Sequence, residues 1–352
     1  MVVAGRGAGR FRARSRRADA REQPGAGVAP DVTALPTEAD VFAAAARIAP
    51  FVHRTPVLTS RSLDDELGAR LFFKCENFQA SGAFKARGAF NAVLSLDAES
   101  AARGVATHSS GNHGAALALA AARRGISAWV VVPTDASGFK RAAISRYGAH
   151  VVDCAPGLAN REAKLAELVE DTGATVVHPY DDSHVIAGQG TAALELLEQA
   201  GALDVLLVPV GGGGLVSGCA LAARAICPQI RIVAAEPAGA DDCWQSMQTG
   251  ERVRLEQVST IADGLRASIG ERNWALISRY VDEVVRVSDD EIVAAMRIAW
   301  ERLKIVVEPS SAVPLAAVLS GRVPVAGCRA GMIFSGGNVD LEALPDLFAA
   351  PG

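Results

Sequence analysis

Residues 206–225 read LLVPVGGGGLVSGCALAARA, in which a short apolar run, four glycines and a longer aliphatic stretch follow one another directly. The apolar run predicts a buried strand, and the small and aliphatic residues after the glycines predict a helix. A strand that passes through a short loop into a helix is typical of α/β proteins, in which ligands bind beyond the carboxyl ends of the strands. Because Gly211, Gly212, Gly213 and Gly214 have no side chains, their N–H groups can close around an anion at the N-terminus of the helix.

Two other phosphate-binding motifs can be compared with this loop. A Walker A loop requires Gly-Lys-Ser/Thr, which does not follow the glycines here. A dinucleotide loop, G-x-G-x-x-G/A, fails because Val216 or Ser217 occupies its last position. Glu236 stands at the end of the next apolar run, where a ribose-binding acid is expected, so a nicotinamide dinucleotide stays open as an alternative. A glycine turn without any ligand is a further alternative, although four glycines cost backbone entropy.

Strand-like and helix-like segments alternate along most of the chain. Further strands are predicted over residues 70–76, 127–133, 148–154, 174–179, 231–237 and 330–337, and helical spacing is seen over residues 113–125 and 190–202. This alternation predicts parallel sheets with helices on both faces. Three of the strands run into small residues, at Ser109–Gly111, Gly211–Gly214 and Ser335–Gly337, and these loops are expected to converge on one crevice.

Composition limits the class of protein. The 352 residues are 50% hydrophobic and carry a formal net charge of −4, which indicates a globular protein and provides no basic footprint for nucleic acid. No apolar run approaches the roughly 18 residues of a membrane helix. Six scattered cysteines without a CxxC pair argue for a reducing, cytoplasmic location and against structural zinc. The arginine-rich residues 1–36 are predicted to form a disordered tail, and they also resemble an organelle transit peptide.

The stretch NFQASGAFKARGAF, residues 77–90, places Lys85 among small and aromatic neighbours. Such surroundings suit an amine whose pKa is lowered by desolvation, although an ordinary helix lysine is the alternative. In THSSGNHGAAL, residues 107–117, Ser110 and Asn112 offer a hydroxyl and an amide at a helix N-terminus, where they could also be a plain N-cap. Taken together with Ser335 and the glycines, these groups match a phosphate, a ring with a hydroxyl and a nitrogen, and an aldehyde. The ligand they describe is pyridoxal phosphate bound to Lys85 as an imine.

The sequence resembles the tryptophan-synthase-β-type (fold type II) pyridoxal-phosphate enzymes, and within them the serine racemase and serine/threonine dehydratase group. The resemblance covers about residues 38–346 and rests on the segments SGAFKARGA, SSGNHG, HPYDDSHVIAGQGT, VPVGGGGLVSG, EPAGADDCWQS, TIADGLRASIG, IVVEPSSAV and SGGNVD. It implies two parallel-sheet domains with helices on both faces. The large, cofactor-binding domain is expected over residues 37–103 and 181–346, the small mobile domain over 104–180, and a tail over 347–352.

The resemblance also implies roles for individual residues. Lys85 forms the imine and acts as a general base, and Ser110 stands on the opposite face of the cofactor. Asn112 binds the 3-hydroxyl of the cofactor, the four glycines bind its phosphate, and Ser335 meets the pyridine nitrogen. The substrate-binding residues are expected to be Ser109, Ser110, Asn112, His113 and Arg161. A divalent cation, Mg²⁺ or Ca²⁺, is expected to be bound by the side chains of Glu236 and Asp242 and the carbonyl of Ala240.

The chain departs from the racemase pattern near the nucleotide effector site of that group. Ala115 replaces the usual glutamine, and Ala80 replaces a lysine, whereas Tyr147, Lys304 and Asn338 match nucleotide-contacting positions. These departures argue against activation by ATP. The resemblance further implies a homodimer.

The expected activity is β-elimination of L-serine or L-threonine to a keto acid and ammonia, with possible racemisation of serine. Serine racemisation as the main activity and threo-3-hydroxyaspartate ammonia-lyase activity are the alternatives, because all of these substrates are small β-hydroxy amino acids. A catalytically silent, cofactor-binding regulatory protein is the alternative outside enzymology. The intact Lys85 and Ser110 argue against it, since binding alone does not require Ser110.

Overall fold

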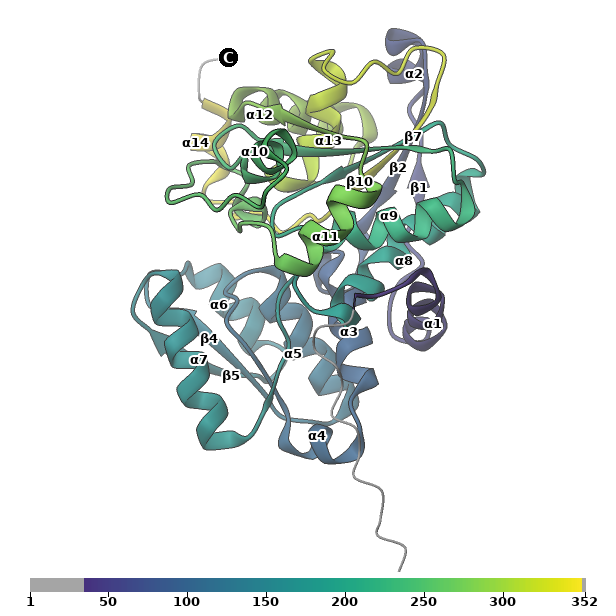
Figure 1. Cartoon of the computed structure of the whole chain (residues 1–352). Helices are drawn as coiled ribbons and strands as arrows, with labels where there is room; N and C mark the ends of the chain where they lie inside the picture. Colours follow the sequence, from purple (N-terminus) through teal and green to yellow (C-terminus); the bar gives the residue numbers. More distant parts are fainter. Residues whose placement is uncertain (1–34, 350–352) are drawn as a thin grey trace, which may run out of the picture. The chain divides into compact units, whose positions relative to one another are not determined.

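The computed structural model describes residues 35–349 and contains two sheets (Figure 1). The larger sheet has six strands in the order β1 (Val57–Leu58), β2 (Arg70–Cys75), β10 (Arg329–Phe334), β7 (Val205–Pro209), β8 (Arg231–Pro237) and β9 (Glu283–Val287). Only β1 pairs antiparallel within it. The smaller sheet is entirely parallel, in the order β5 (His150–Cys154), β4 (Ala128–Pro133), β3 (Val105–Thr107) and β6 (Thr175–Val176). The predicted α/β fold with parallel sheets is confirmed.

Helices cover both faces of the six-stranded sheet. One face packs against α1 (Glu38–Ile48), α8 (Ser183–Ala200), α9 (Gly214–Ile226) and α11 (Glu271–Tyr280). The other face packs against α2 (Arg61–Leu67), α12 (Asp289–Ile298), the π-helical turn Ala299–Leu303 and α13 (Pro309–Leu319). Along β7, Leu206 and Val208 face the first group of helices, and Val205 and Leu207 face the second. The strand is therefore buried on both sides, which explains its continuous apolar sequence.

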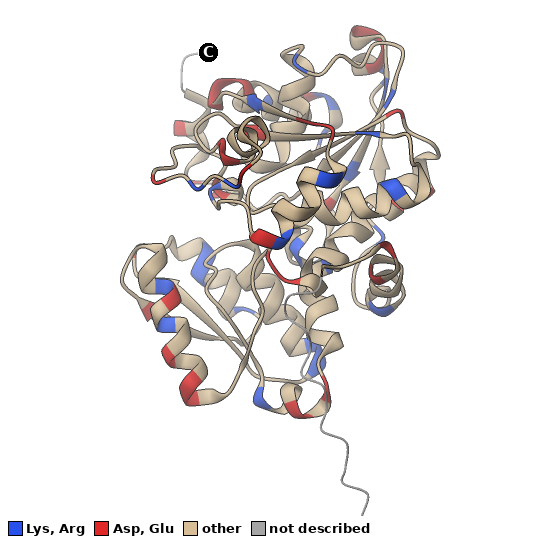
Figure 2. Ribbon diagram, in the orientation of Figure 1, with Lys and Arg blue, Asp and Glu red and all other residues tan. Residues whose placement is uncertain are grey.

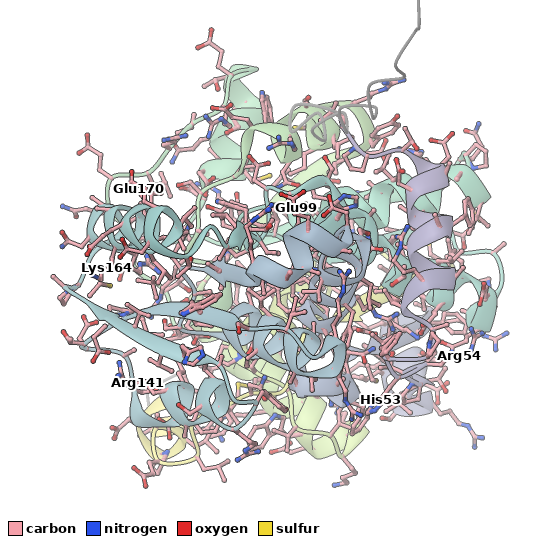
Figure 3. All side chains as sticks on the ribbon, turned by 90° about the horizontal axis from the view of Figure 1, so that it is seen from below. His53, Arg54, Glu99, Arg141, Lys164 and Glu170 are labelled. Carbon is pink, nitrogen blue, oxygen red and sulfur yellow. The ribbon has the colours of Figure 1, made fainter. Side chains whose placement is uncertain are left out.

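The four-stranded sheet is also covered on both faces. Residues of α5 (Asn112–Arg124) and α6 (Gly138–Ser145) pack on Val130 and Val132, whereas α7 (Leu158–Thr172) packs on Ala106 and Val131. Figure 3 labels Lys164 and Glu170 on α7, which lies along one side of these strands.

The remaining elements are short. They are α3 (Lys85–Ser95), α4 (Ala98–Arg103), α10 (Asp242–Thr249), α14 (Leu344–Ala349) and the 3-10 turns Glu76–Phe78, Ala80–Gly82 and Asp263–Leu265. Basic and acidic residues are interspersed over the described chain (Figure 2). Among the described helices, none combines the length and apolar character needed to cross a membrane.

Each of the seven predicted strands overlaps an observed one, but the prediction over residues 174–179 was too long, because only Thr175–Val176 is a strand. The helix predicted over 190–202 begins earlier, at Ser183. Three observed strands, β1, β3 and β9, lie outside the predicted strand ranges. The first two have only two and three residues, and Glu283 and Arg286 interrupt the short apolar run of β9. The predicted tail over residues 1–36 lies outside the described residues except for positions 35 and 36. Of the tail over 347–352, residues 347–349 belong to α14 and the rest is outside the described part.

Candidate active site

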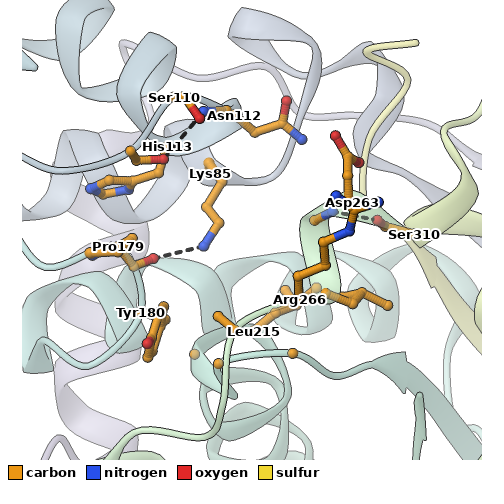
Figure 4. Close-up of a pocket in the computed structure, with 18 of the residues that line it drawn as sticks. Lys85, Ser110, Asn112, His113, Pro179, Tyr180, Leu215, Asp263, Arg266 and Ser310 are labelled. Carbon is orange, nitrogen blue, oxygen red and sulfur yellow. Dashed lines mark hydrogen bonds between the residues drawn. The ribbon is translucent and has the colours of Figure 1, made fainter. Parts of the chain in front are cut away.

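A pocket of about 950 Å³ lies beyond the carboxyl ends of strands from both sheets. Its lining includes Ser109–Gly111 after β3, Gly211–Gly214 after β7 and Ser335 after β10. The three loops thus meet in one crevice, as the succession of strands and small residues predicted. Figure 4 shows this pocket with Lys85 at its centre.

Lys85 is the first residue of α3, and the turn before it is tied to the loop that follows β10. The Phe84 N–H donates to the Ser335 carbonyl at 2.9 Å, and the Gly337 N–H donates to the Gly82 carbonyl at 3.0 Å. Ser81, one residue earlier, has the left-handed backbone angle φ 59°, which is uncommon for a residue other than glycine. These bonds fix where α3 begins and hence where the Lys85 side chain enters the pocket.

The surroundings of the Lys85 amine desolvate it. Its Nζ donates to the Pro179 carbonyl at 2.7 Å, a bond drawn in Figure 4, and lies 5.0 Å from the centre of the Phe84 ring. Burial lowers the pKa of Lys85 to about 8, although the nearby Glu308 carboxylate opposes the shift. A substantial fraction of the amine is therefore neutral near pH 8, as imine formation and proton abstraction both require.

The glycine loop presents a row of unused backbone donors. The N–H groups of residues 211–216 donate to no acceptor among residues 35–349, and Gly213, with φ 94°, is the N-cap of α9. Unpaired N–H groups at a helix N-terminus, with the positive end of the helix dipole behind them, form a site for a phosphate. The loop therefore fits the phosphate of pyridoxal phosphate.

The same loop has no room for side chains. A Cβ on Gly212 would lie 2.3 Å from Cγ of Tyr180, and one on Gly211 would lie 2.7 Å from the Leu265 Cα. The loop is held by the Asn273 amide, which donates to the Gly212 carbonyl at 2.8 Å and to the Tyr180 carbonyl at 2.9 Å. The glycines are needed because the loop is closely packed from behind, which leaves its N–H groups facing the pocket.

The Ser109–His113 loop enters the pocket at the N-terminus of α5. In the view of Figure 4, Ser110 and Asn112 lie on one side of Lys85, and Tyr180 and Leu215 lie on the other. Both the nitrogen and the oxygen of the Asn112 side-chain amide form hydrogen bonds within the protein. Its Nδ2 donates to the Glu308 carboxylate at 3.0 and 3.1 Å, and its Oδ1 accepts from the Asn338 amide at 2.9 Å. The sequence predicted Asn112 in the pocket but not these partners.

Glu308 is a pocket residue that sequence reasoning did not single out. It is buried immediately before α13, 196 residues from the Asn112 side chain that it accepts from. Burial, with a contribution from Asp263, raises the pKa of Glu308 to about 8. The only sequence signal was its position within IVVEPSSAV, one of the segments that carried the resemblance.

Two predicted substrate-binding residues differ in their surroundings. His113 is buried, its Nε2 contacts the Val177 carbonyl at 3.2 Å, and burial lowers its pKa well below the usual value. Arg161 lines the pocket, and its Nε is buried without a hydrogen-bond partner among the described residues. It forms no ion pair within residues 35–349 either, so its positive charge is available to an anion.

Ser335 lies at the end of β10 and is 2% exposed. Its carbonyl is bonded to Phe84, but its hydroxyl has no hydrogen bond to any of residues 35–349. Ser335 lines the pocket, and a hydroxyl there without a protein partner fits a ring nitrogen of the cofactor.

The predicted metal ligands lie between β8 and α10. Glu236 accepts from the N–H groups of Trp244 at 2.6 Å and Cys243 at 3.3 Å, and Asp242 accepts from the Ile269 N–H at 2.7 Å. Burial, followed by mutual repulsion among these acids, raises the pKa of Glu236 well above its usual value, and burial raises that of Asp242 to about 6. Neither has a basic partner among the described residues, whereas Asp241 pairs with Arg286 at 2.7 Å.

Two buried, unpaired carboxylates with oxygen lone pairs left over suit a hard divalent cation. The described residues contain no group of three or more His, Cys, Asp or Glu side chains placed to hold a metal. The expected site has only two acidic side chains and completes its ligands with the Ala240 carbonyl.

Comparison with known proteins identifies the class of protein. Residues 48–336 match the family described as "Pyridoxal-phosphate dependent enzyme". The serine racemase of Arabidopsis thaliana is 53% identical over 307 residues, which cover 86% of this chain and 93% of the relative. The β-hydroxyaspartate dehydratase of Paracoccus denitrificans is 48% identical over 311 residues, which cover 88% of this chain and 99% of the relative. The solved structure of maize serine racemase matches with a TM-score of 0.87 and 48% identity, covering 89% of this chain and 97% of that chain.

The fold and these matches define a pyridoxal-phosphate dependent enzyme of fold type II. Within that class, the chain belongs to the serine racemase family, so the predicted family and the predicted pyridoxal phosphate are confirmed. The relatives favour our alternative, serine racemisation, over our main expectation of a serine/threonine dehydratase.

The steric contacts of the glycine loop lead to a prediction. Gly212→Ala brings a Cβ against the Tyr180 ring, so the loop must open and its N–H groups must turn away from the phosphate. We expect the dissociation constant for pyridoxal phosphate to rise by about tenfold or more, which corresponds to about 1.4 kcal/mol. Titration of the apoenzyme, followed by absorbance, measures it. Gly138→Ala is the control because nothing lies within 4 Å of its Cβ position. Equal affinities for the two variants would contradict the close packing of the loop.

Proposed function

We propose that this protein racemises serine and also eliminates water from it. The observation that carries the proposal is the pairing of Lys85 and Ser110 in one pocket of a serine racemase family member. A racemase needs two proton-transferring groups, one for each face of the substrate carbon, whereas elimination from L-serine needs only the first.

The residues that would hold the cofactor follow from the pocket. Lys85 would bond to its aldehyde, the N–H groups after β7 would bind its phosphate, Asn112 would bind its 3-hydroxyl, and Ser335 would meet the ring nitrogen. When bound, pyridoxal phosphate supplies an electron sink for the bond pair released at the substrate α-carbon. A neutral serine beside the ring nitrogen is a poor proton donor, so this sink is weaker than a full pyridinium.

The other pocket groups bind the substrate and move its protons. The Ser109–His113 loop and Arg161 receive the substrate carboxylate, since loop N–H groups at the start of α5 and an unpaired guanidinium both favour an anion. Lys85, with a pKa of about 8, removes the α-proton from the L-face. Return of a proton by Ser110 on the other face gives D-serine, whereas loss of the β-hydroxyl leads to pyruvate and ammonia.

Closure of residues 104–180 over the substrate forms part of the proposal. Lys140 on α6 pairs with Asp263 at 2.6 Å, and Asn112 on α5 bonds Glu308, so two contacts already join the segments on either side of the pocket. Closure would exclude water during proton transfer. A homodimer is proposed from the family alone. Activation by ATP is not proposed, because both N–H groups of the Asn338 amide are engaged, one with Ser81 and one with Asn112.

A second candidate substrate is threo-3-hydroxyaspartate. The β-hydroxyaspartate dehydratase of Paracoccus denitrificans is a relative, and the pocket lining is rich in arginine, namely Arg146, Arg161, Arg252, Arg254 and Arg266. Of these, only Arg252 pairs with an acid among residues 35–349, namely Glu271, and Arg266 donates to the Thr260 carbonyl instead. Unpaired guanidinium groups favour a substrate with a second carboxylate. Ratios of kcat/KM for serine, threonine and hydroxyaspartate, with both product types measured, rank the candidates.

The first prediction concerns the covalent anchor. Lys85→Ala should lose turnover by at least about a thousandfold, because both the covalent bond to the cofactor and the general base are removed. Pyridoxal phosphate should still bind through the glycine loop. Borohydride reduction followed by peptide mapping should label Lys85 in the wild type and no lysine in the variant. Wild-type labelling at another lysine would refute the assignment, and labelling at Lys85 without turnover of any of the three substrates would leave a silent binding protein.

The second prediction concerns Ser110, on the face of the substrate α-carbon opposite Lys85. Ser110→Ala should lower D-serine formation by about 100-fold or more, because the typical contribution of a positioned acid or base is about 10² to 10⁴. Exchange of the α-deuteron of L-serine in H₂O should change much less, since it needs only Lys85. NMR of the two enantiomers measures both rates. An equal loss of exchange from L- and D-serine would show that the two faces are not served separately.

The third prediction concerns the acidic loop, which we propose binds Mg²⁺ or Ca²⁺ through Glu236, Asp242 and the Ala240 carbonyl. A cation that binds only the folded state at a hundredfold excess over its Kd stabilises the protein by about 2.7 kcal/mol. EDTA should therefore lower the melting temperature, and either cation should restore it. Asp241→Asn is the matched control because Asp241 already pairs with Arg286, and it should keep the response to chelator that Asp242→Asn loses. A wild-type melting temperature indifferent to EDTA would mean that the acids bind no cation.

A further inference from the structure

A buried charge network lies behind α3, outside the pocket. Arg87 is fully buried and donates to both oxygens of Glu76 at 2.7 and 2.8 Å and to both oxygens of Glu195 at 2.8 and 2.9 Å. Lys74 completes the network by donating to Glu195 at 2.6 Å. None of these four residues lines the pocket, and their charges balance.

Every donor in the network has a partner. The one remaining Arg87 N–H, on Nη1, donates to the Thr191 hydroxyl at 3.1 Å. The Lys74 amine also donates to the Thr55 carbonyl at 2.7 Å and to Gln199 at 3.0 Å. The Arg87 side chain of α3 is thereby bonded directly to Glu76, the residue after β2, and to one face of α8. Lys74 of β2 joins the network through Glu195.

Stability alone does not account for such a network. Buried ion pairs can commonly be replaced by apolar residues of similar volume without loss of stability, because desolvation offsets the attraction between the charges. A planar guanidinium with two bidentate partners adds a directional constraint. It fixes the rotation of the arginine side chain as well as its distance from the two carboxylates. Such a directional constraint matters where another group requires a fixed rotation of α3 about its helix axis.

The helices α3 and α8 meet at backbone distance. A Cβ on Gly188 would lie 2.6 Å from the Gly88 Cα, so the two helices touch at glycines. Contacts between glycines let helices approach closely, and side chains around the contact then set the angle about the helix axis. The Gly88 N–H donates to Oε1 of Gln189 at 3.1 Å, and the Asn91 amide donates to the His184 carbonyl at 2.7 Å. Arg87 adjoins this contact and adds charge-assisted bonds to Glu195 and a bond to Thr191, both on α8.

Lys85 depends on that angle. It precedes Arg87 by two residues, so the two side chains leave α3 about 200° apart, one toward the pocket and the other toward the network. The amine of Lys85 must also meet the Pro179 carbonyl at 2.7 Å, in the segment that leads into α8. Because Arg87 is bonded to Thr191 and Glu195 of α8, it joins the two elements that carry Lys85 and its acceptor.

We propose that Arg87 is a positioning residue, whose buried bonds to Glu76, Glu195 and Thr191 aim Lys85 into the pocket. The proposal rests on the role assigned to Lys85 above. Arg87 contacts neither the pocket nor any reacting atom, and it acts only by fixing the first turn of α3 against α8.

The test uses a variant that removes Arg87 without stranding a charge. Arg87→Met together with Glu76→Gln leaves the Lys74–Glu195 pair intact. In the holoenzyme, we expect kcat to fall by about 10- to 100-fold with KM changed by less than about twofold, because a misplacement of about 1 Å at a reacting group has this size of effect. In the apoprotein, trace acylation across pH with peptide mass spectrometry should show the midpoint for Lys85, near 8 in the wild type, moving up toward that of an ordinary lysine.

Two further variants separate aiming from folding. Arg87→Lys keeps the charge balance and should fold, but a point-like ammonium cannot form both bidentate contacts, so it should reproduce the loss of kcat. Lys74→Gln perturbs the same network without touching α3, and it should lower the melting temperature while leaving the Lys85 midpoint and kcat within about twofold of wild type.

The outcomes distinguish this proposal from the assignment of Lys85 itself. Wild-type kcat and an unshifted Lys85 midpoint in Arg87→Lys would overturn the proposal, and so would an equal loss of kcat in Lys74→Gln. If the wild type is not labelled at Lys85 by borohydride, the proposed catalytic role fails. The acylation midpoints, which require no cofactor, would still show whether Arg87 aims the amine.

Discussion

The site depends on one helix, α8, which touches two others at backbone distance. A Cβ on Gly188 would meet the Gly88 Cα of α3 at 2.6 Å, and one on Gly190 would meet the Gly218 carbonyl oxygen of α9 at 2.5 Å. The three helices begin close to the pocket. Lys85 starts α3, the glycine loop leads into α9, and Pro179 and Tyr180 precede α8. Small residues at these crossings therefore set how far the covalent anchor lies from the phosphate loop.

The pocket places an amine and a carboxyl group of similar proton affinity near each other. Burial lowers the pKa of Lys85 to about 8, and burial raises that of Glu308 to about 8. Each group would be charged at neutral pH in water, and the dry pocket brings both closer to their neutral forms. An amine that serves as a base must lose its proton easily, and a carboxyl group held by the Asn112 amide need not remain an anion to keep its hydrogen bonds.

The sequence was sufficient for the fold because buried parallel strands have continuous apolar runs, and because small residues mark the loops at their carboxyl ends. It was also sufficient to bring Lys85, Ser110, Asn112, the four glycines and Ser335 to one pocket. The edge strand β9 was missed because charged residues interrupt it.

The roles of Pro179 and Glu308 could not be predicted for a different reason. Pro179 acts through a backbone carbonyl, which any residue type supplies, and the Glu308–Asn112 contact joins positions 196 residues apart. Likewise, nothing local to Arg87 indicates that its partners are Glu76 and Glu195, because Glu195 lies 108 residues away.

The acidic loop and the phosphate loop share a short path of hydrogen bonds. Asp242 accepts from the Ile269 N–H, and the N–H of the next residue, Gly270, donates to the Gly212 carbonyl at 3.1 Å. A cation bound at Asp242 would therefore restrain the peptide that supports the cofactor's phosphate. Thermodynamic linkage makes such an effect reciprocal, so whatever factor the cation adds to cofactor affinity, the cofactor must add to cation affinity. Two ligands that never touch would then be retained, or lost, together.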